Sequence, residues 1–391
     1  MPPWRLLALP GFQLGAFVAE GWAAYRGTSP YSEVPPLAPS LRVVGEAVLD
    51  RSFTLAMNLM TGVPHPSTMR RAHADVEDMV AFVRERGWHE DPLGYHQTPP
   101  PVDEYALCKE QIWAGPRPTR YEHLSFSSDF APHPDEPGRR RWIAYDSNHV
   151  SHAYVMRHKG PPRPWLVCAH GFGMGGPLVN LRGFGAQRLH DELGLNLVFP
   201  CMPLHGPRSP GRISGAEVLA PDYLRLIHLF AQSVWDIRRV IDWVRARGAP
   251  RIGLYGLSLG AYNSSLVGAL EDDLDCMIAG IPAVDFANVA RDNEPWVIRR
   301  YDDEFKVDWH TVRAATHVVS PLAVSPRVPH EGRFIFAGIA DRVARPDQAR
   351  ALWRHWERPA IHWFSGGHVA GQLNRGIEPF VHGALRATLL R

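Results

Sequence analysis

The sequence is poor in cysteine and carries little net charge. It has four cysteines in 391 residues and no CxxC pair, so neither a disulfide framework nor a cysteine-rich metal site is expected. The formal net charge is +2, from 42 basic and 40 acidic residues. This balance gives no electrostatic reason to expect nucleic acid or an anionic membrane surface as a partner. The free thiols fit a reducing compartment, and we expect a cytoplasmic protein, with export as the alternative.

Long hydrophobic runs and the common metal and phosphate motifs are also missing. The N-terminal stretch 4–25 is mildly apolar, but Pro10, Gly11 and Gly15 interrupt it. It is too broken for a membrane-spanning helix and lacks the apolar core of a signal peptide. The twenty histidines show no HExxH spacing, and no GxxxxGK[ST] loop occurs. We therefore expect no integral membrane segment, no metal and no cofactor.

The first 118 residues contain helical patterns separated by proline-rich breaks. Val76, Met79, Val80 and Val83 fall on one face of a helix predicted over 74–86. A second short helix is predicted over 104–113, and we find no strand alternation in this part. The sequence thus predicts an N-terminal helical extension over 1–118 and a separate domain over 119–391.

From residue 119 onward, strand patterns dominate. Strands are predicted over 122–129, 141–145 and 150–157. They are followed by short apolar runs at 165–169, 195–199, 251–255, 276–280, 333–338 and 360–364. Continuous apolar runs of this length are typical of strands that are buried on both faces of a parallel sheet. An amphipathic helix is predicted over 222–247. Strands that alternate with helices predict the α/β class, with a mostly parallel central sheet covered by helices on both faces.

A candidate nucleophile lies between the apolar run 251–255 and a helical stretch. The residues are Gly256-Leu257-Ser258-Leu259-Gly260, a GxSxG pattern. The pentapeptide alone is a weak signal, but a strand, a sharp turn and a helix together expose a serine hydroxyl at the sheet edge. The glycines allow that turn, and the helix start offers N–H groups to a developing oxyanion. The alternative is a tight turn with an exposed serine.

A serine nucleophile needs a base, and His368 is the candidate. It ends the stretch Ser365-Gly366-Gly367-His368, directly after the last predicted strand. A glycine loop at the end of a strand can bring an imidazole onto a neighbouring serine. His362 is the rival, but it lies inside the strand run. A purely structural loop histidine is the further alternative.

The histidine in turn needs a carboxylate that fixes its tautomer. Asp341 follows the run 333–338, and the chain order serine, aspartate, histidine is the one expected for this strand–helix arrangement. Asp285, which follows the run 276–280, is the alternative acid. We favour Asp341 and expect Asp285 to cap or line the segment that follows it.

An oxyanion hole requires two N–H groups. The Leu259 amide, next to the candidate nucleophile, is one expected donor. The glycine-rich loop after the run 165–169 supplies the other, with Phe172 as the expected donor and Gly173 as the next choice. The alternative is a glycine-rich turn with no such role.

Taken in order, these motifs resemble the α/β-hydrolase superfamily from about Arg163 to the C-terminus. The HGxG loop, the GxSxG elbow, the late aspartate and the final GGH all occur, and only Ala261 departs from the double glycine that many members have. The resemblance implies a serine esterase that needs no cofactor. His205 and Arg208 lie in a loop similar to those beside the active site. They bind a polar substrate group or, equally, pack a turn.

Residues 285–330 stand where this superfamily usually carries a lid. The aromatic residues there predict an apolar acyl pocket or, alternatively, packing of the lid onto the body. They are Trp296, Tyr301, Phe305 and Trp309. We expect the N-terminal extension to cover the mouth of the site or to form a surface for homo-oligomers.

The expected function is hydrolysis of a small carboxylic ester by Ser258, His368 and Asp341 through an acyl-enzyme. The same residues would serve a peptidase or amidase, a thioesterase or an acyltransferase, because the leaving group is selected elsewhere. A non-catalytic binding protein of the same fold is the alternative from another class.

Overall fold

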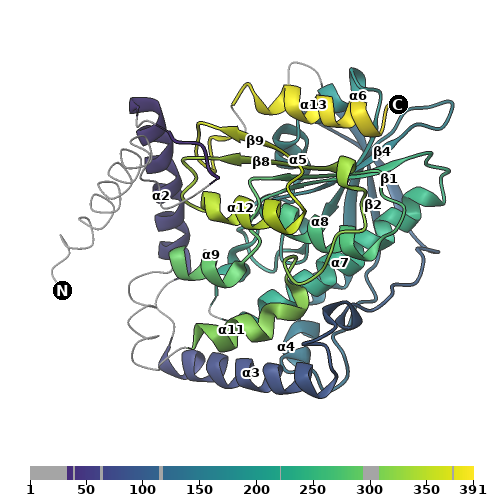
Figure 1. Cartoon of the computed structure of the whole chain (residues 1–391). Coiled ribbons are helices and arrows are strands. Elements are labelled where there is room, and N and C mark those ends of the chain that lie inside the picture. The colour runs from purple at the N-terminus through teal and green to yellow at the C-terminus, as the bar shows by residue number, and fades with distance from the viewer. Residues whose placement is uncertain are drawn as a thin grey trace.

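A central sheet organises the chain. The computed structural model describes residues 33–37, 40–61, 65–113, 118–220, 222–293, 308–371 and 374–391. The strands in this part are β1 Ala106–Trp113, β2 Pro118–Ser127, β3 Val150–Met156, β4 Trp165–Ala169, β5 Asn196–Cys201, β6 Ile252–Leu257, β7 Cys276–Gly280, β8 Arg333–Gly338 and β9 Ala360–Phe364. They form one sheet in the order β1-β2-β3-β5-β4-β6-β7-β8-β9 (Figure 1).

Most of the sheet is parallel. The pairs β1/β2, β2/β3 and β3/β5 are antiparallel, whereas every pair from β5/β4 to β8/β9 is parallel. The carboxyl ends of β4, β6, β7, β8 and β9 therefore lie at the same edge of the sheet. In parallel sheets with helices on both faces, this edge is where ligands bind.

Helices flank the sheet on both faces. The α-helices are α2 Leu41–Thr61, α3 Pro66–Glu85, α4 Arg139–Ile143, α5 Pro177–Gly183, α6 Ala186–Asp191, α7 Tyr223–Arg245, α8 Leu259–Leu270, α9 Phe286–Asn293, α11 Trp309–Thr316, α12 Pro346–His355 and α13 Ile377–Thr388. Short 3₁₀ helices are η1 Pro92–Tyr95, η2 Asp146–Asn148, η3 Gly206–Arg208, η4 Ala216–Leu219, η5 His317–Val319 and η6 His330–Gly332.

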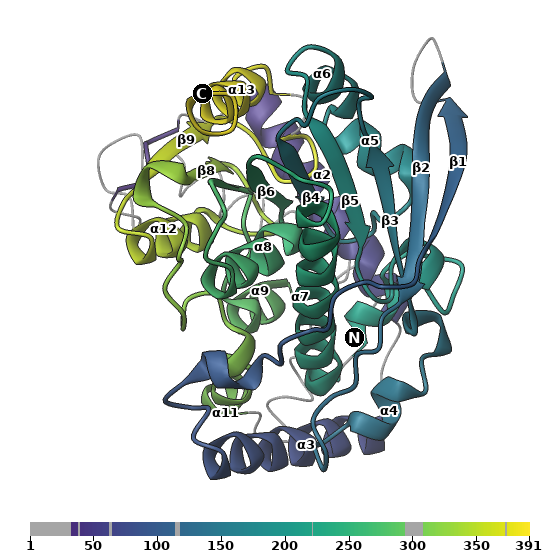
Figure 2. The same ribbon diagram turned by 90° about the vertical axis from the view of Figure 1, so that its right-hand side faces the viewer.

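Successive side chains of the central strands enter two different cores. In β4, Leu166 and Cys168 join the core under α5, α6 and α13, whereas Val167 and Ala169 join the core under α7, α8 and α12. Side chains alternate in this way because the strand repeat is two residues. Figure 2 shows the two layers of helices on either side of the strands. The predicted fold class, a mostly parallel sheet between helices, is confirmed.

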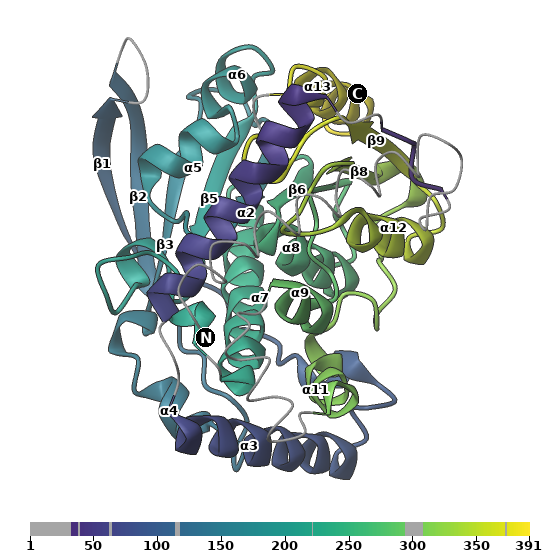
Figure 3. The same ribbon diagram turned by 90° about the vertical axis from the view of Figure 1, so that its left-hand side faces the viewer.

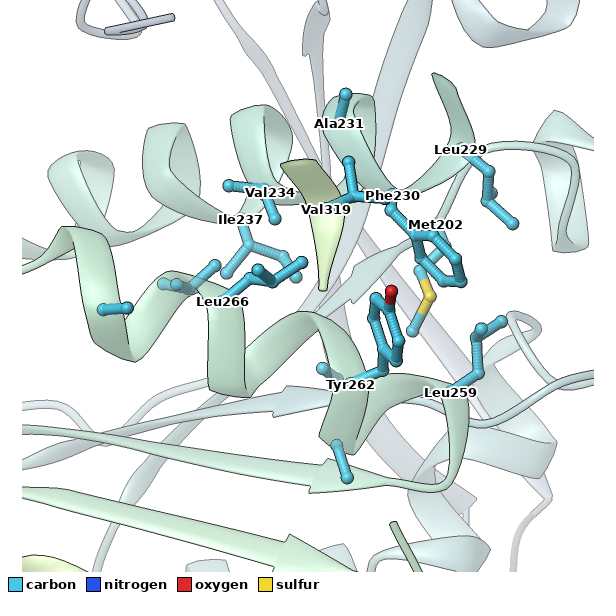
Figure 4. Packing of buried hydrophobic residues seen from close by; sticks show 14 of the residues in the cluster. Met202, Leu229, Phe230, Ala231, Val234, Ile237, Leu259, Tyr262, Leu266 and Val319 are labelled. Carbon is cyan, nitrogen blue, oxygen red and sulfur yellow. The ribbon is translucent and has the colours of Figure 1, made fainter. Parts of the chain in front are cut away.

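Helix α7 supports the helix that follows the candidate nucleophile. The Asp222 carboxylate accepts the Arg225 N–H and starts α7, as the helix predicted over 222–247 requires. Apolar side chains of α7 then pack against α8 (Figure 4). The Phe230 and Tyr262 rings stack with centroids 4.1 Å apart. This contact between the two helices holds α8, and with it the turn before α8, against the sheet.

Two local predictions were wrong. The helix predicted over 104–113 is strand β1, which pairs with β2 along its whole length. Its side chains are mostly exposed, so pairing with β2 overrides the helix-forming composition. The strand predicted over 141–145 is helix α4. It starts after Gly138 in the left-handed region, and Trp142 is its buried anchor.

The N-terminal part is helical up to β1. The helix predicted over 74–86 is α3, and it begins earlier, at Pro66, behind the capping residue His65. Helix α2 runs diagonally across the body in Figure 3 and contacts η4. The sheet begins at Ala106, within the stretch that the sequence assigned to the helical extension.

Part of the predicted lid falls in the described residues. Helix α9 opens this segment and α11 continues it after residue 307. Trp296, Tyr301 and Phe305 lie outside the described residues. Within the described ranges no helix has the length and apolar character needed to span a membrane.

Candidate active site

Ser258 occupies a strained turn between β6 and α8. Its φ and ψ are 53° and −112°, a region that costs energy for any residue with a Cβ and that is concentrated at functional sites. Gly256 and Gly260, on either side of the serine, are required because backbone carbonyl groups lie too close to them for a side chain. A Cβ on Gly256 would overlap the Gly260 carbonyl, and a Cβ on Gly260 would overlap the Ala169 carbonyl at the end of β4. The turn thus holds the serine hydroxyl above the sheet edge.

Ser258, His368 and Asp341 form a hydrogen-bonded chain. The Ser258 hydroxyl donates to His368 Nε2 over 2.9 Å, and His368 Nδ1–H donates to Asp341 Oδ2 over 2.6 Å. The other oxygen of Asp341 accepts the Val343 and Ala344 N–H groups, each at 2.8 Å. The loops after β8 and β9 therefore bring together the three residues that the sequence had proposed.

The surroundings of His368 favour its charged form. Burial opposes the imidazolium, but the Asp341 carboxylate outweighs burial and raises the pKa of His368 above its ordinary value. Asp341 is 1% exposed. When the ring is neutral and carries its proton on Nδ1, Nε2 faces the Ser258 hydroxyl and can take its proton, which is the arrangement that general-base catalysis needs.

The two rival residues have other partners. Asp285 accepts the Asn288 N–H at 3.0 Å and caps α9, as the sequence interpretation expected. His362 lies in β9 and stacks on Phe380 of α13, with ring centroids 5.5 Å apart. Neither of them belongs to the hydrogen-bonded chain that contains Ser258.

The two residues expected to supply oxyanion-hole amides, Leu259 and Phe172, line the same cavity as Ser258. Leu259 is the first residue of α8, where an N–H group has no acceptor within its own helix. Phe172 lies in the loop after β4. Gly173 does not line this cavity; its φ of +75° makes it the turning point of the loop.

A buried histidine anchors that loop. His170 donates from Nδ1 to the Gly171 carbonyl over 2.8 Å, and its Nε2 accepts the Met202 N–H over 3.0 Å. Burial lowers the pKa of His170 to about 3, so the ring stays neutral and keeps both bonds. The loop is thereby held at the end of β5.

His205 and Arg208 are buried and are not among the residues that line the cavity, which fits the second of their two expected roles, the packing of a turn. Arg208 is completely buried. It donates to Asp236 on α7 over 2.7 Å and to the Cys201 and Asn148 carbonyls. A buried guanidinium needs such partners, and these contacts explain why it points inward. His205 Nδ1–H donates to the Pro203 carbonyl over 2.9 Å in the same buried turn.

A cavity of about 350 Å³ opens above Ser258. Its walls are mostly aliphatic and aromatic, and Trp309, one of the aromatic residues proposed from the sequence for an acyl pocket or for lid packing, is among them. The side chains come from α2, η4, α7, α9, α11 and the loops after β4, β8 and β9. An apolar cavity with a few convergent polar groups is the usual form of a small-molecule site. In the described residues no cluster of three or more His, Cys, Asp or Glu side chains could hold a metal.

Helix α2 supplies one wall of the cavity, and the sequence did not identify its residues. Phe53, Thr54, Met57 and Asn58 line the space. The Asn58 amide donates to the Asn293 carbonyl over 3.1 Å and ties α2 to the end of α9. One helix of the N-terminal part therefore forms part of the cavity wall.

The comparisons with known proteins give two relatives in sequence. "Uncharacterized protein MT2702" of Mycobacterium tuberculosis strain CDC 1551 is 39% identical over 381 residues, which are 96% of this chain and 89% of the relative. "Uncharacterized protein Rv2627c" of strain H37Rv matches with the same identity and coverage. No model of a known protein family matches the chain.

Comparison with solved structures supports the fold described above. Acetyl xylan esterase 1 from Thermoanaerobacterium sp. JW/SL YS485 is 14% identical, with a TM-score of 0.51 over 77% of this chain and 93% of that one. An acetyl xylan esterase from Paenibacillus sp. R4 is 15% identical, with a TM-score of 0.51 over 78% of this chain and 93% of that one. At such identity the likeness shows the fold. The chain thus has the α/β-hydrolase fold and belongs to one family with the mycobacterial proteins MT2702 and Rv2627c.

Proposed function

We propose that the protein is a serine hydrolase that cleaves carboxylic esters through an acyl-enzyme. The observation that carries this proposal is the hydrogen-bonded chain Ser258–His368–Asp341, which ends at the floor of an apolar cavity. A free serine hydroxyl is a poor nucleophile, and a neighbouring imidazole held by a carboxylate is what activates it.

In the first half of the reaction, Ser258 Oγ attacks the ester carbonyl as His368 Nε2 takes its proton. The carbonyl oxygen becomes an oxyanion, which the Leu259 and Phe172 N–H groups stabilise. Asp341 stabilises the imidazolium that has formed. When the tetrahedral intermediate collapses, His368 returns the proton to the alkoxide, and the alcohol leaves.

In the second half, water takes the place of the alcohol. His368 removes a proton from the water, whose oxygen attacks the acyl carbon. The new intermediate breaks the bond to Ser258, and the serine oxygen recovers its proton from His368. The carboxylic acid leaves, and the enzyme returns to its starting state with no net change in its own protons or electrons.

The cavity supports an ester with an apolar acyl or alkyl part. Phe53, Met57, Phe286 and Trp309 are among its walls. Its volume of about 350 Å³ lies near the lower end of ligand pockets, which span about 300–1,000 Å³. We therefore expect short and medium chains to be preferred over long ones. The two acetyl xylan esterases of the same fold are consistent with an ester as the substrate class.

A fluorophosphonate probe and a panel of p-nitrophenyl esters of rising acyl length test the proposal. The wild type should be labelled and should hydrolyse the shorter esters, whereas Ser258→Ala should do neither. The matched control is Ser264→Ala, a serine two turns further along α8 whose hydroxyl has no hydrogen-bond partner within the described residues. It should behave like the wild type.

Different failures point to different corrections. Labelling that survives Ser258→Ala would remove this residue as the nucleophile. Labelling without ester turnover would direct the test to p-nitroanilides, acyl thioesters and acyl transfer to added alcohols, which use the same three residues. The absence of both labelling and turnover would favour a binding protein.

A further inference from the structure

A carboxylate from α2 lies directly behind the loops that carry His368 and Asp341. It belongs to Asp50, which is completely buried. The amides that it contacts are 292 to 319 residues away in the sequence. An acidic residue is almost never fully buried unless it has charged or hydrogen-bonding partners, so these contacts call for an explanation.

Both oxygens of Asp50 accept backbone hydrogen bonds from the candidate catalytic loops. Oδ2 accepts the His368 N–H at 2.7 Å and the Arg342 N–H at 3.0 Å, and Oδ1 accepts the Val369 N–H at 2.9 Å. Arg342 directly follows Asp341. One carboxylate therefore joins the backbone beside the candidate base to the backbone beside the candidate acid.

The glycines before His368 match this contact. A Cβ on Gly367 would lie 2.8 Å from the Asp50 carboxylate, and a Cβ on Gly366 would lie 2.7 Å from the Glu46 carboxylate. Glu46, one turn before Asp50 on α2, also accepts the Gly367 N–H at 3.0 Å. The glycine pair thus leaves space for two carboxylates of α2 against the loop.

We propose that Asp50 is a positioning residue for the hydrolysis: it holds the His368 and Asp341 loops in register, and its negative charge stabilises the imidazolium formed in each proton transfer. This inference rests on the proposed function of Ser258, His368 and Asp341. With this role for Asp50, α2 contributes to catalysis as well as to the cavity wall.

Asp50 is the second carboxylate, after Asp341, that acts on the charge of His368. Burial, followed by the Asp341 carboxylate, raises the pKa of Asp50, and its bonds to the loop amides act in the opposite direction. Two carboxylates act on the imidazole from different elements, Asp341 from the loop after β8 and Asp50 from α2, and both raise the pKa of His368. The other charged side chains of α2 are Arg42 and Glu46, which pair over 2.9 Å, and Arg51. Arg51 interacts electrostatically with Arg342, Arg345 and Asp292 from outside α2.

The test measures kcat and KM on a p-nitrophenyl ester from pH 5 to 9 for the wild type, Asp50→Asn and Asp50→Ala. Misplacement of a catalytic group by about 1 Å costs about 10² in rate. We expect kcat to fall about 10- to 100-fold and KM to change by less than about threefold. Because a negative charge beside His368 is lost, the acid limb of kcat/KM should move to lower pH.

Two control variants separate this role from general destabilisation. Asp275→Asn makes the same chemical change in a carboxylate that accepts the Ile252 N–H at 2.9 Å on another side of the sheet. Leu55→Ala changes an exposed residue of α2 itself. Both should keep the kcat and the acid limb of the wild type. Thermal unfolding is followed for every variant, and the isosteric Asp50→Asn decides the matter if Asp50→Ala does not fold. A folded Asp50→Asn with an unchanged acid limb would overturn the proposal.

A measurement without turnover keeps the two proposals distinguishable. Histidine NMR in the Ser258→Ala background reports the pKa of His368 directly, with and without Asp50→Asn. A lower pKa in the double variant supports the electrostatic role even if no ester is hydrolysed, in which case the proposed function alone fails. An unchanged pKa would overturn the role of Asp50 even if the wild type proves to be an active esterase.

Discussion

Replacing Asp341 by asparagine tests the candidate site most severely, because the structure dictates how the new amide must sit. In the native chain one oxygen of Asp341 accepts the Val343 and Ala344 N–H groups, and the other accepts His368 Nδ1–H. An asparagine oxygen must stay with the two backbone donors, since an NH₂ group there would face two N–H groups. The NH₂ group then points at His368 Nδ1.

This orientation forces the wrong tautomer. Facing a donor, His368 Nδ1 must become the acceptor, and the ring proton moves to Nε2, where it meets the Ser258 hydroxyl. Nε2 of His368 then carries a proton and can no longer accept one from the Ser258 hydroxyl. The analogous change in a serine protease lowers kcat about 10⁴-fold, which corresponds to about 5 kcal/mol of transition-state stabilisation. We expect a loss of the same order here.

The assay is the kcat for a short p-nitrophenyl ester, with thermal unfolding as a check on folding. Asp285→Asn is the matched control, because that carboxylate caps α9 and does not contact His368. It should keep kcat within about threefold of the wild type, as expected of a change outside the reacting groups. A folded Asp341→Asn that retains a tenth of the activity, or an inactive Asp285→Asn, would refute the assignment of Asp341 as the acid.

Three further predictions follow from the same contacts. The raised pKa of His368 places the acid limb of kcat/KM above pH 6.5, because the neutral base is depleted below that pKa; a limb below pH 6 in a pH–rate profile would contradict it. Gly260→Ala should lower the free energy of unfolding, measured in urea, by about 1–3 kcal/mol, because the new methyl group overlaps the end of β4. Gly45→Ala should raise the free energy of unfolding by about 0.5–1 kcal/mol, because a methyl group at this helical position meets open space. The reverse order would show that the turn is not tightly packed. Arg208→Ala should cost about 3–5 kcal/mol by leaving its buried carboxylate partner unpaired, with KM for the ester unchanged. A raised KM without loss of stability would return Arg208 to the substrate site.

The strands that build the site could be predicted because burial leaves a direct mark on them. The runs 165–169 and 276–280 match β4 and β7 residue for residue. Each is apolar throughout because both of its faces are covered. Strand β1 has no such continuous apolar run, since its side chains are largely exposed and its one partner among the described strands of the sheet is β2. Its strand form comes from pairing, which a local pattern does not contain.

The site also contains residues that a local sequence pattern reveals and residues that depend on distant partners. Ser258, Asp341 and His368 follow strand ends in the order that this fold imposes, so the sequence could name them, and the structure brings them together. Their catalytic roles remain predictions. Asp50 gave only a faint signal, an acidic residue in the buried stripe that also contains Val43, Ala47 and Thr54. Nothing local indicates the partners of this carboxylate, because they lie near the other end of the chain.

The bond between α2 and the loops near the C-terminus also has a consequence for the order of assembly. During synthesis α2 leaves the ribosome first, and the amides that Asp50 binds are added only after about 290 further residues. The carboxylates of α2 stay solvated until β8 and β9 have joined the sheet, because their amide partners lie in the loops after these two strands. Contacts of such long sequence separation form late because chain closure is slow. The proposed esterase activity should therefore return after refolding later than the secondary structure of the sheet does.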